Sequence, residues 1–208
     1  MNTHSAPRGL LRSRGPFLFF LSFFFLLLTG EAPSPMRVAD LTLTLLSPYH
    51  APITAKGVFY QSGPKVRQEP AGSEEIDLYD LKQMEEIRLF PADRIYFKTR
   101  LGPARTLKAV LEGWMPAPTP VTEKRLLLRE GEIKGKSARL YLILLEEKGN
   151  KWHSLRWVTS DEAEIPLQVI YPASDYETII ADYDSLRTEP SDPARFEPPP
   201  DFLSVNPY

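Results

Sequence analysis

The feature that most constrains this chain is a series of apolar runs, separated by turn residues, between Arg139 and Val205. The stretch RLYLILLEEKGNKWHSLRWVTSDEAEIPLQVIY alternates apolar and aromatic runs with a Lys-Gly-Asn turn and a charged turn, and ETIIADYDSL adds a further run. Strand-length runs spaced by about 8–12 residues are typical of antiparallel β-structure. The prolines of SDPARFEPPPDF then mark the end of the sheet, because proline has no N–H to donate to a strand ladder.

Period-2 runs continue back to Ile53, so strands are predicted to dominate the fold. One segment has a different period, because its apolar residues are spaced as on one face of a helix. These residues are Leu107, Val110, Leu111 and Trp114. Pro103 suits the first turn of a helix, where its missing N–H is not needed. We therefore predict a helix over Pro103–Gly113 that packs its apolar stripe on a sheet.

The N-terminal residues have the pattern of a secretory signal peptide. Residues 1–15 contain three arginines and no acid, and the apolar block Pro16–Gly30 follows. The core of this block, Phe17–Leu28, is short for a hydrocarbon layer of about 30 Å. We predict a signal peptide at 1–32 and a single domain at 33–208, with an uncleaved inner-membrane anchor as the alternative. Either outcome makes the protein periplasmic or otherwise extracytoplasmic.

The charge balance and the absence of cysteine exclude several kinds of partner and chemistry. The chain has 25 Lys and Arg against 27 Asp and Glu, a formal charge of −2. Nucleic-acid binding needs clustered basic residues that neutralise phosphates, so a nucleic-acid partner is not expected. The chain contains no cysteine, which excludes disulfides, thiolate catalysis and cysteine-bound metals.

The residues that could carry catalysis or bind a metal are not arranged for either. Adjacent residues of a strand point to opposite faces, so the pairs Glu74-Glu75, Glu85-Glu86 and Glu146-Glu147 do not form facing carboxyls. Ser154 and Ser160 lack a G-x-S-x-G setting. The candidate metal ligands lack ligand spacing; they are His153, Asp161, Glu162 and Glu164. We expect no catalytic residue, metal site or cofactor, and a hydrolase is disfavoured.

Three sequence patterns follow one another in the order in which they occur in a known protein family. They are the G-x-x-Y-x-x-G-x-K-x-R-x-E pattern of residues 57–69, Trp157 with Ile165-Pro166-Leu167, and D-P-x-x-F-E-x-P at residues 192–199. Over Ile53–Phe202 the chain resembles the LolA/LolB-like superfamily of periplasmic lipoprotein carriers, and more narrowly an uncharacterised bacterial domain family of that fold. The resemblance implies an α+β fold of mostly antiparallel strands. It implies a curved, incomplete β-barrel (half-barrel), with helices covering its concave side and an apolar cavity for acyl chains.

Two points separate this chain from the superfamily's pattern. LolB-like proteins are anchored through a cysteine, which this chain lacks, so the trafficking role does not follow from the fold. The superfamily also places a helix near Val38–Leu46, whereas the alternation of leucine and threonine in this segment favours a strand. The sequence leaves both structures open for this segment.

The resulting hypothesis is an exported, non-catalytic binding protein that holds a lipid or a lipoprotein acyl chain. The candidate ligand-binding residues are Trp114, Leu107, Val110, Leu111 and Trp157. Trp114 is expected at the mouth of the cavity, with the proline-rich loop Met115–Pro120 as a lid. Trp152 and Trp157 differ in parity, so at most one of them faces the cavity. The alternative is an envelope interaction or sensor protein that binds a partner protein. Membrane contact is expected only through an uncleaved leader.

Overall fold

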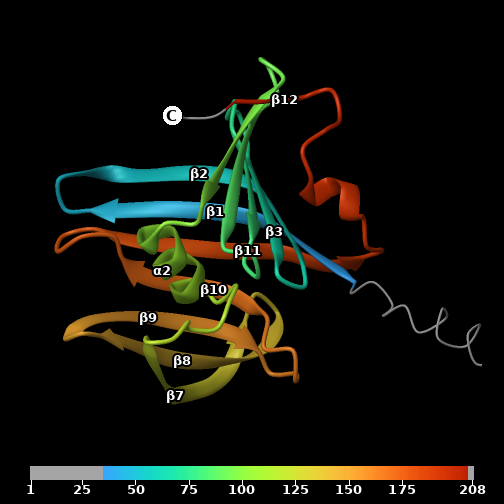
Figure 1. The fold of residues 1–208 in the computed structure, drawn as a ribbon. Helices are drawn as coiled ribbons and strands as arrows, with labels where there is room; N and C mark the ends of the chain where they lie inside the picture. Colours follow the sequence, from blue (N-terminus) through green and yellow to red (C-terminus); the bar gives the residue numbers. More distant parts are fainter. Residues whose placement is uncertain (1–34, 206–208) are drawn as a thin grey trace, which may run out of the picture. The chain divides into compact units, whose positions relative to one another are not determined.

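Twelve strands form one sheet in the computed structural model, which describes residues 35–205 (Figure 1). The predicted signal peptide at 1–32 lies outside the described residues. The strands are β1 (Met36–Ser47), β2 (His50–Ser62), β3 (Lys65–Pro70), β4 (Ile76–Asp80), β5 (Glu85–Phe90), β6 (Ile95–Arg100), β7 (Thr122–Ile133), β8 (Lys136–Glu147), β9 (Asn150–Thr159), β10 (Pro166–Pro172), β11 (Thr178–Glu189) and β12 (Leu203–Ser204). The helices are α2 (Pro103–Leu111) and the 3₁₀-helix η1 (Pro193–Phe196).

The strand order joins two antiparallel meanders. The order is β12-β6-β5-β4-β3-β2-β1-β11-β10-β9-β8-β7, and only the β12–β6 pair is parallel. The long strands β1 and β11 pair at the centre, where Leu41 lies opposite Tyr183. The prediction of mostly antiparallel strands is therefore confirmed. Val38–Leu46 belongs to β1, so the alternation in the sequence gave the correct structure for this segment.

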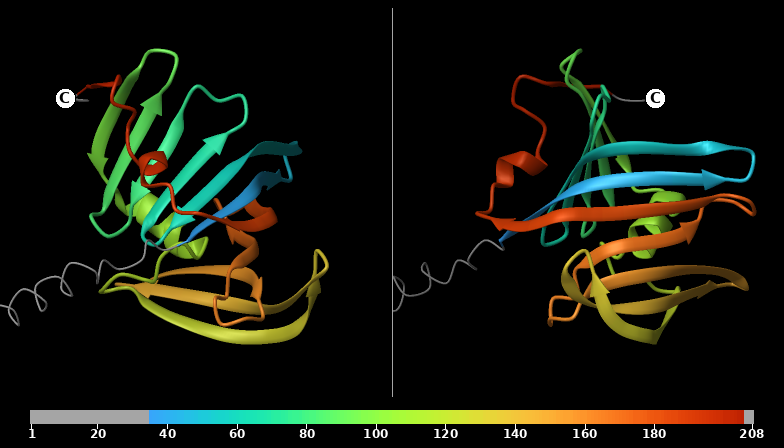
Figure 2. Two further views of the ribbon diagram at one scale, coloured as in Figure 1. Left: turned by 90° about the vertical axis from the view of Figure 1, so that its right-hand side faces the viewer. Right: turned by 180° about the vertical axis from the view of Figure 1, so that it is seen from behind.

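The sheet is open and strongly curved, which fits an incomplete barrel. Figure 2 shows β3–β6 turning steeply away from the direction of β1, β2 and β11. Irregularities interrupt the ladders at Val38/Asp40, Leu45/Ser47, Leu127/Arg129 and Pro166/Gln168. Bulges of this kind bend a strand and increase its twist. They account for part of the curvature.

The connection from β6 to β7 crosses from one end of the strand order to the other, and it contains α2. We call the face of the sheet against which α2 packs the inner face. Val110 and Leu111 of α2 join one core with residues of β1, β2, β8, β10 and β11. The helix lies in its predicted place but ends at Leu111. It is the one α-helix in residues 35–205, so the expectation of several covering helices is corrected to one.

The opposite, outer face is covered by the chain's C-terminal segment, residues 190–202. Phe196 of η1 packs with Met36, Val38 and Tyr60 in a second buried cluster. Two further contacts hold the segment: the guanidinium of Arg195 lies 4.6 Å from the centre of the Tyr60 ring, and Arg67 Nη1 donates to the Arg195 carbonyl at 2.7 Å. The prolines therefore end the pairing of β11, as predicted, and the segment then lines the outer face. Pairing resumes after it, where β12 adds to β6 in parallel.

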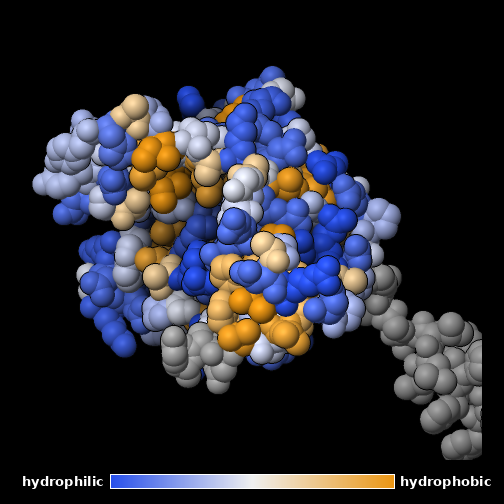
Figure 3. Space-filling view, turned by 90° about the horizontal axis from the view of Figure 1, so that it is seen from above, coloured by the Kyte–Doolittle hydropathy of each residue, from blue (hydrophilic) through white to orange (hydrophobic). Residues whose placement is uncertain are grey.

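Exposed apolar residues occur in separate places. Figure 3 shows hydrophobic patches separated by hydrophilic side chains on the face seen from above. On β7, which ends the strand order, the consecutive residues Leu126, Leu127 and Leu128 are 50%, 51% and 52% exposed. Successive strand residues point to opposite faces. These leucines therefore leave apolar surface on both faces of the terminal strand.

Candidate binding cavity

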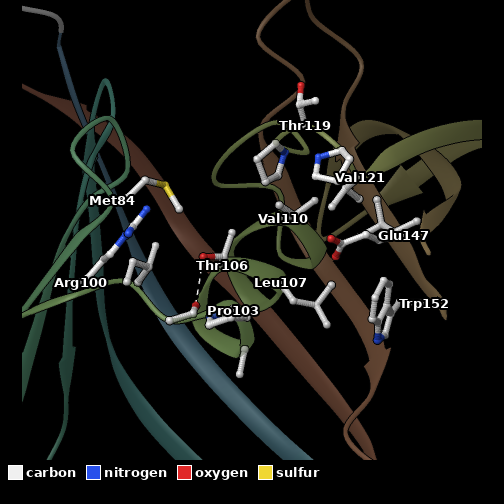
Figure 4. Close-up of a pocket in the computed structure, with 16 residues that line it drawn as sticks. Met84, Arg100, Pro103, Thr106, Leu107, Val110, Thr119, Val121, Glu147 and Trp152 are labelled. Atoms are coloured by element: carbon white, nitrogen blue, oxygen red, sulfur yellow. Dashed lines mark hydrogen bonds between the residues drawn. The ribbon is translucent and has the colours of Figure 1, made fainter. Parts of the chain in front are cut away.

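A cavity of about 690 Å³ lies between α2, the loop that follows it, and the β8–β9 hairpin (Figure 4). Apolar residues supply most of its lining: Met84, Leu101, Pro103, Ala104, Leu107, Val110, Pro118, Pro120, Val121, Leu145 and Trp152. The polar side chains are those of Arg100, Thr106, Thr119 and Glu147. Thr106 Oγ1 donates to the Gly102 carbonyl at 3.0 Å, so this hydroxyl already has a partner.

The cavity has an apolar floor and a mixed rim. Leu101, Val110 and Leu145 are 5%, 2% and 1% exposed and form the floor. Arg100 and Thr119 are exposed and belong to the rim. Figure 4 shows Arg100 on one side of the cavity and Glu147 on the other. A ligand with an apolar chain and a polar end therefore finds both environments in one site.

The structure brings two of the five predicted binding residues to the cavity. Leu107 and Val110 line it, and Leu111 lies in the adjoining core. Trp114 lies in that core as well, at 7% exposure, rather than at the mouth. Its Nε1 donates to Tyr183 Oη at 2.8 Å. The helical spacing therefore identified the buried face of α2 but not the part of that face that borders the cavity.

The two tryptophans of β9 lie on opposite faces, as their parity predicts. Trp152 lines the cavity, whereas Trp157 packs with Ala138 and Leu167 in a separate cluster. The sequence analysis counted Trp157, and not Trp152, among the binding residues; the same-face neighbours of Trp152, Ser154 and Arg156, are polar and give no local sign of a buried face. Arg156 is nevertheless buried, at 7% exposure.

The polar residues of β9 hold the C-terminal end of α2. Arg156 Nη2 donates to the carbonyls of Val110 and Leu111 at 2.7 and 3.0 Å, and Ser154 Oγ donates to the Leu111 carbonyl at 3.3 Å. The last carbonyls of a helix lack partners within it and attract cations. Gly113 has φ +81°, and a Cβ there would lie 3.0 Å from the guanidinium carbon. Burial lowers the pKa of Arg156.

A buried carboxylate holds the same end of the helix. Glu112 is fully buried and accepts hydrogen bonds from Tyr171 Oη at 2.5 Å and Tyr183 Oη at 3.3 Å. Lys108 Nζ lies 3.1 Å from its Oε1. Burial, followed by the negative charge of Glu112, raises the pKa of Tyr171 and of Tyr183. A buried charge is tolerated when it is paired and hydrogen-bonded, so this cluster attaches α2 to β10 and β11.

A second hollow, of about 420 Å³, lies on the outer face beside the C-terminal segment. Its lining includes Lys65, Glu85, Lys98 and Glu197. These charges are paired: Lys98 Nζ lies 2.8 Å from Glu85 Oε2, and Lys65 Nζ lies 3.5 Å from Glu197 Oε1. An apolar ligand here would have to remove paired charges from water, which is costly. The inner cavity is therefore the better candidate for an apolar ligand.

The candidates for catalysis and metal binding remain apart. Ser154 is buried, whereas the adjacent His153 is exposed on the other face of β9. Within residues 35–205, no group of three or more histidine or acidic residues is placed to hold a metal ion. In the same range, no helix has both the length and the apolar character needed to cross a membrane.

The chain was compared with family models, curated proteins and solved structures. No family model and no curated protein matches the chain. Among solved structures, a LolA superfamily protein from Nitrosomonas europaea is 11% identical, with a TM-score of 0.43 over 79% of this chain and 90% of that protein. A DUF1329 family protein from Desulfovibrio piger is 12% identical, with a TM-score of 0.40 over 86% and 95%.

A third solved structure, the Mycobacterium tuberculosis lipoprotein LppX, is 9% identical to the chain, with a TM-score of 0.38 over 74% and 88%. All three structures have TM-scores below 0.5, so none of them carries an argument about this chain. The function has to be inferred from the cavity.

Proposed function

We propose that this chain is an exported, non-catalytic binding protein that holds a lipid or a lipoprotein acyl chain in its inner cavity. The observation that carries the proposal is a cavity of about 690 Å³ with an apolar floor. Small-molecule sites have volumes of about 300–1,000 Å³ and are mostly apolar. Burial of an acyl chain contributes about 0.8 kcal/mol for each CH₂ group removed from water.

The topology gives a reason for the unfilled space. Within residues 35–205, one α-helix of nine residues, α2, lies in the connection from β6 to β7 and packs on the inner face. Arg156 and Glu112 hold its C-terminal end on the sheet, whereas Pro103 and Ala104 at its other end are exposed and border the cavity. The space beside the N-terminal half of α2 is therefore closed mainly by a loop.

That loop is the proposed lid. Pro118, Thr119 and Pro120 line the cavity between α2 and β7. Proline has no N–H to donate, so this segment forms few of the backbone hydrogen bonds that would fix it to the sheet. Displacement of the loop would open the cavity without breaking a strand ladder.

A binding role without catalysis is supported by the position of the candidate nucleophile. The Ser154 hydroxyl donates to the Leu111 carbonyl, and the neighbouring imidazole of His153 lies across the strand. A nucleophile needs a base within hydrogen-bonding reach. This arrangement favours a structural role for Ser154.

The test is ligand binding by a variant in which the cavity is filled. The exported protein is titrated with a fluorescent fatty acid, and solvent-extracted samples are analysed for lipid by mass spectrometry. Leu107→Trp adds bulk to the cavity wall and should weaken binding at least about tenfold, because the chain loses burial equivalent to about two CH₂ groups. Leu128→Trp, on β7 and outside the cavity, is the matched control and should bind as the wild type does.

The same titration and lipid extraction can also contradict the proposal. If the wild type shows no saturable binding and carries no extractable lipid, the carrier hypothesis fails. The alternative, an envelope protein that binds a partner protein, then takes its place. The half-exposed leucines of the terminal strand β7 favour that alternative, since an unpaired strand edge can accept a strand from another chain. Under the alternative, Leu127→Glu should abolish chemical cross-linking to the partner.

A further inference from the structure

The charges around the inner cavity bear on the kind of ligand it takes, provided that the proposed function holds. Arg100, the last residue of β6, lines the rim of the cavity and is exposed. Its backbone belongs to the β5–β6 ladder, but its guanidinium forms no hydrogen bond or ion pair with any other residue in the described range 35–205. Its guanidinium is the one cationic group among the residues that line this cavity.

The acidic residues near Arg100 are engaged elsewhere. Glu85 lies opposite Arg100 in the β5–β6 ladder, but its carboxylate pairs with Lys98 at 2.8 Å. Glu86, on the same strand, lies 3.2 Å from Arg88 Nε and 3.6 Å from Arg105 Nε. Arg100 therefore retains donors that a ligand can use.

The opposite side of the cavity carries the opposite charge. Glu147, at the end of β8, is half-buried, lines the cavity and has no ion-pair partner among residues 35–205. Figure 4 shows it on the side of Trp152, across the cavity from Arg100. A negative group of a ligand is repelled near Glu147 and attracted near Arg100. The two charges thus give the cavity a polarity.

We propose that the cavity selects amphiphiles with an anionic head group, a carboxylate or a phosphate, which Arg100 binds at the rim. The chain then lies over Leu101, Val110 and Leu145, toward Trp152. The planar guanidinium suits this role because it can donate two parallel hydrogen bonds to a carboxylate or a phosphate. The apolar floor provides the affinity, and Arg100 provides the selection between head groups.

The test compares head groups at constant chain length. The neutral dye N-phenylnaphthylamine is bound to the full-length exported protein and displaced by dodecanoate, dodecyl phosphate, dodecanol or dodecyltrimethylammonium. In the wild type, at least one of the two anions should bind about tenfold more tightly than the alcohol, since hydrogen bonds to charged groups are the strong ones. The order of the two anions identifies the preferred head group. The cation should bind most weakly of the four.

Two variants test the residues themselves. Arg100→Gln should remove the preference for anions and leave dodecanol binding unchanged. The control is Arg94→Gln, which changes an exposed arginine next to β6 and outside the cavity lining. It should alter neither the preference for anions nor the binding of dodecanol. Glu147→Gln should strengthen anion binding about two- to fivefold, because a repulsive charge is removed. Added salt should weaken the binding of dodecanoate but not the binding of dodecanol.

The outcomes separate this inference from the proposed function. If dodecanol displaces the dye as well as both dodecanoate and dodecyl phosphate do, the inference is wrong and the acyl-binding function stands. If Arg100→Gln weakens the binding of dodecanol as much as the binding of dodecanoate, Arg100 has a structural role and the inference is again wrong. If no amphiphile displaces the dye and no lipid is extracted, the proposed function itself fails.

Discussion

The two faces of the sheet are covered by different parts of one chain, and the two coverings leave chemically different spaces. On the inner face, α2 and the loop after it leave about 690 Å³ over an apolar floor. On the outer face, the C-terminal segment leaves about 420 Å³ among paired charges. Burial of an apolar chain in the first space lowers the free energy. Binding of the same chain in the second space requires the removal of charged groups from water, which is unfavourable. The nature of the lining therefore decides which space is a candidate site.

The coverings also differ in how they are attached. The inner one is attached at one end by buried charges, Arg156 and Glu112, whose partners are helix carbonyls and tyrosine hydroxyls. The outer one is attached by the packing of Phe196 and by the contacts of Arg195. If this comparison is correct, damage to the inner covering should affect both stability and binding. Damage to the outer covering should affect stability alone.

The largest effect is expected from Leu111→Asp in the inner covering. Leu111 is 5% exposed, and a carboxylate in its place would be buried among apolar side chains. We expect a loss of about 4 kcal/mol in the free energy of unfolding, together with loss of acyl binding. Urea denaturation and dye titration measure the two effects. Leu111→Met, which nearly conserves volume, is the control and should cost less than about 1.5 kcal/mol. An unchanged melting temperature in Leu111→Asp would mean that α2 does not pack on the sheet.

An intermediate effect is expected from Phe196→Ala in the outer covering. Phe196 is 6% exposed in the cluster with Met36, Val38 and Tyr60. Its truncation should cost about 3 kcal/mol of stability, because buried apolar surface is lost and a cavity is left. Dodecanoate affinity should stay at the wild-type value. The exposed Leu203→Ala, in β12, is the matched control and should change stability by less than about 0.5 kcal/mol. Weakened ligand binding in Phe196→Ala would break the proposed independence of the two faces.

The smallest effect concerns pH and the tyrosines beneath α2. The pKa values of Tyr171 and Tyr183 are raised above the ordinary value of 10.0, first by burial and then by Glu112. Above pH 10 the unfolded chain releases these protons while the folded chain keeps them, so stability falls as pH rises. Below pH 10 both states keep the protons and the effect is absent. The expected slope is about 1.4 kcal/mol per pH unit for each tyrosine.

Urea denaturation at about pH 8 and about pH 11 measures this slope. Tyr171→Phe should be less stable at both values but should lose less stability between them than the wild type. Tyr176→Phe removes an exposed hydroxyl and should keep the wild-type difference. Equal slopes in all three proteins would contradict burial of the phenol beneath the helix.

The sequence predicted the elements better than the site. The helical spacing of Leu107 and Val110 identified α2 and its buried face, because periodicity depends on local geometry. In β1 the alternation favoured a strand, although the sequence alone left a helix open. The cavity depends on which distant elements meet. Leu145 and Trp152 reach it from β8 and β9, and no local pattern links them to α2.

Two buried polar residues at the C-terminal end of α2 were also not predicted. Arg156 lies among polar residues of β9 and Glu112 follows the apolar stripe of α2, and neither carries a local sequence signal of burial. Both are buried because each meets a group that needs a partner: the helix carbonyls for Arg156, and the hydroxyls of Tyr171 and Tyr183 for Glu112. Partners of this kind become visible only when the strands are assembled.

The central pairing of β1 with β11 has a consequence for the order of assembly under the proposed export. Leu41 lies opposite Tyr183, so β1 can complete its pairing only when β11, which lies near the end of the chain, is available. Contacts between residues so far apart in sequence make folding slow, because the loop between them has to be closed first. A chain that emerges from a translocation pore N-terminus first would expose the free edge of β1 until β11 has followed. Under the proposed export, the period of greatest risk of aggregation is set by the time needed to translocate the C-terminal third of the chain.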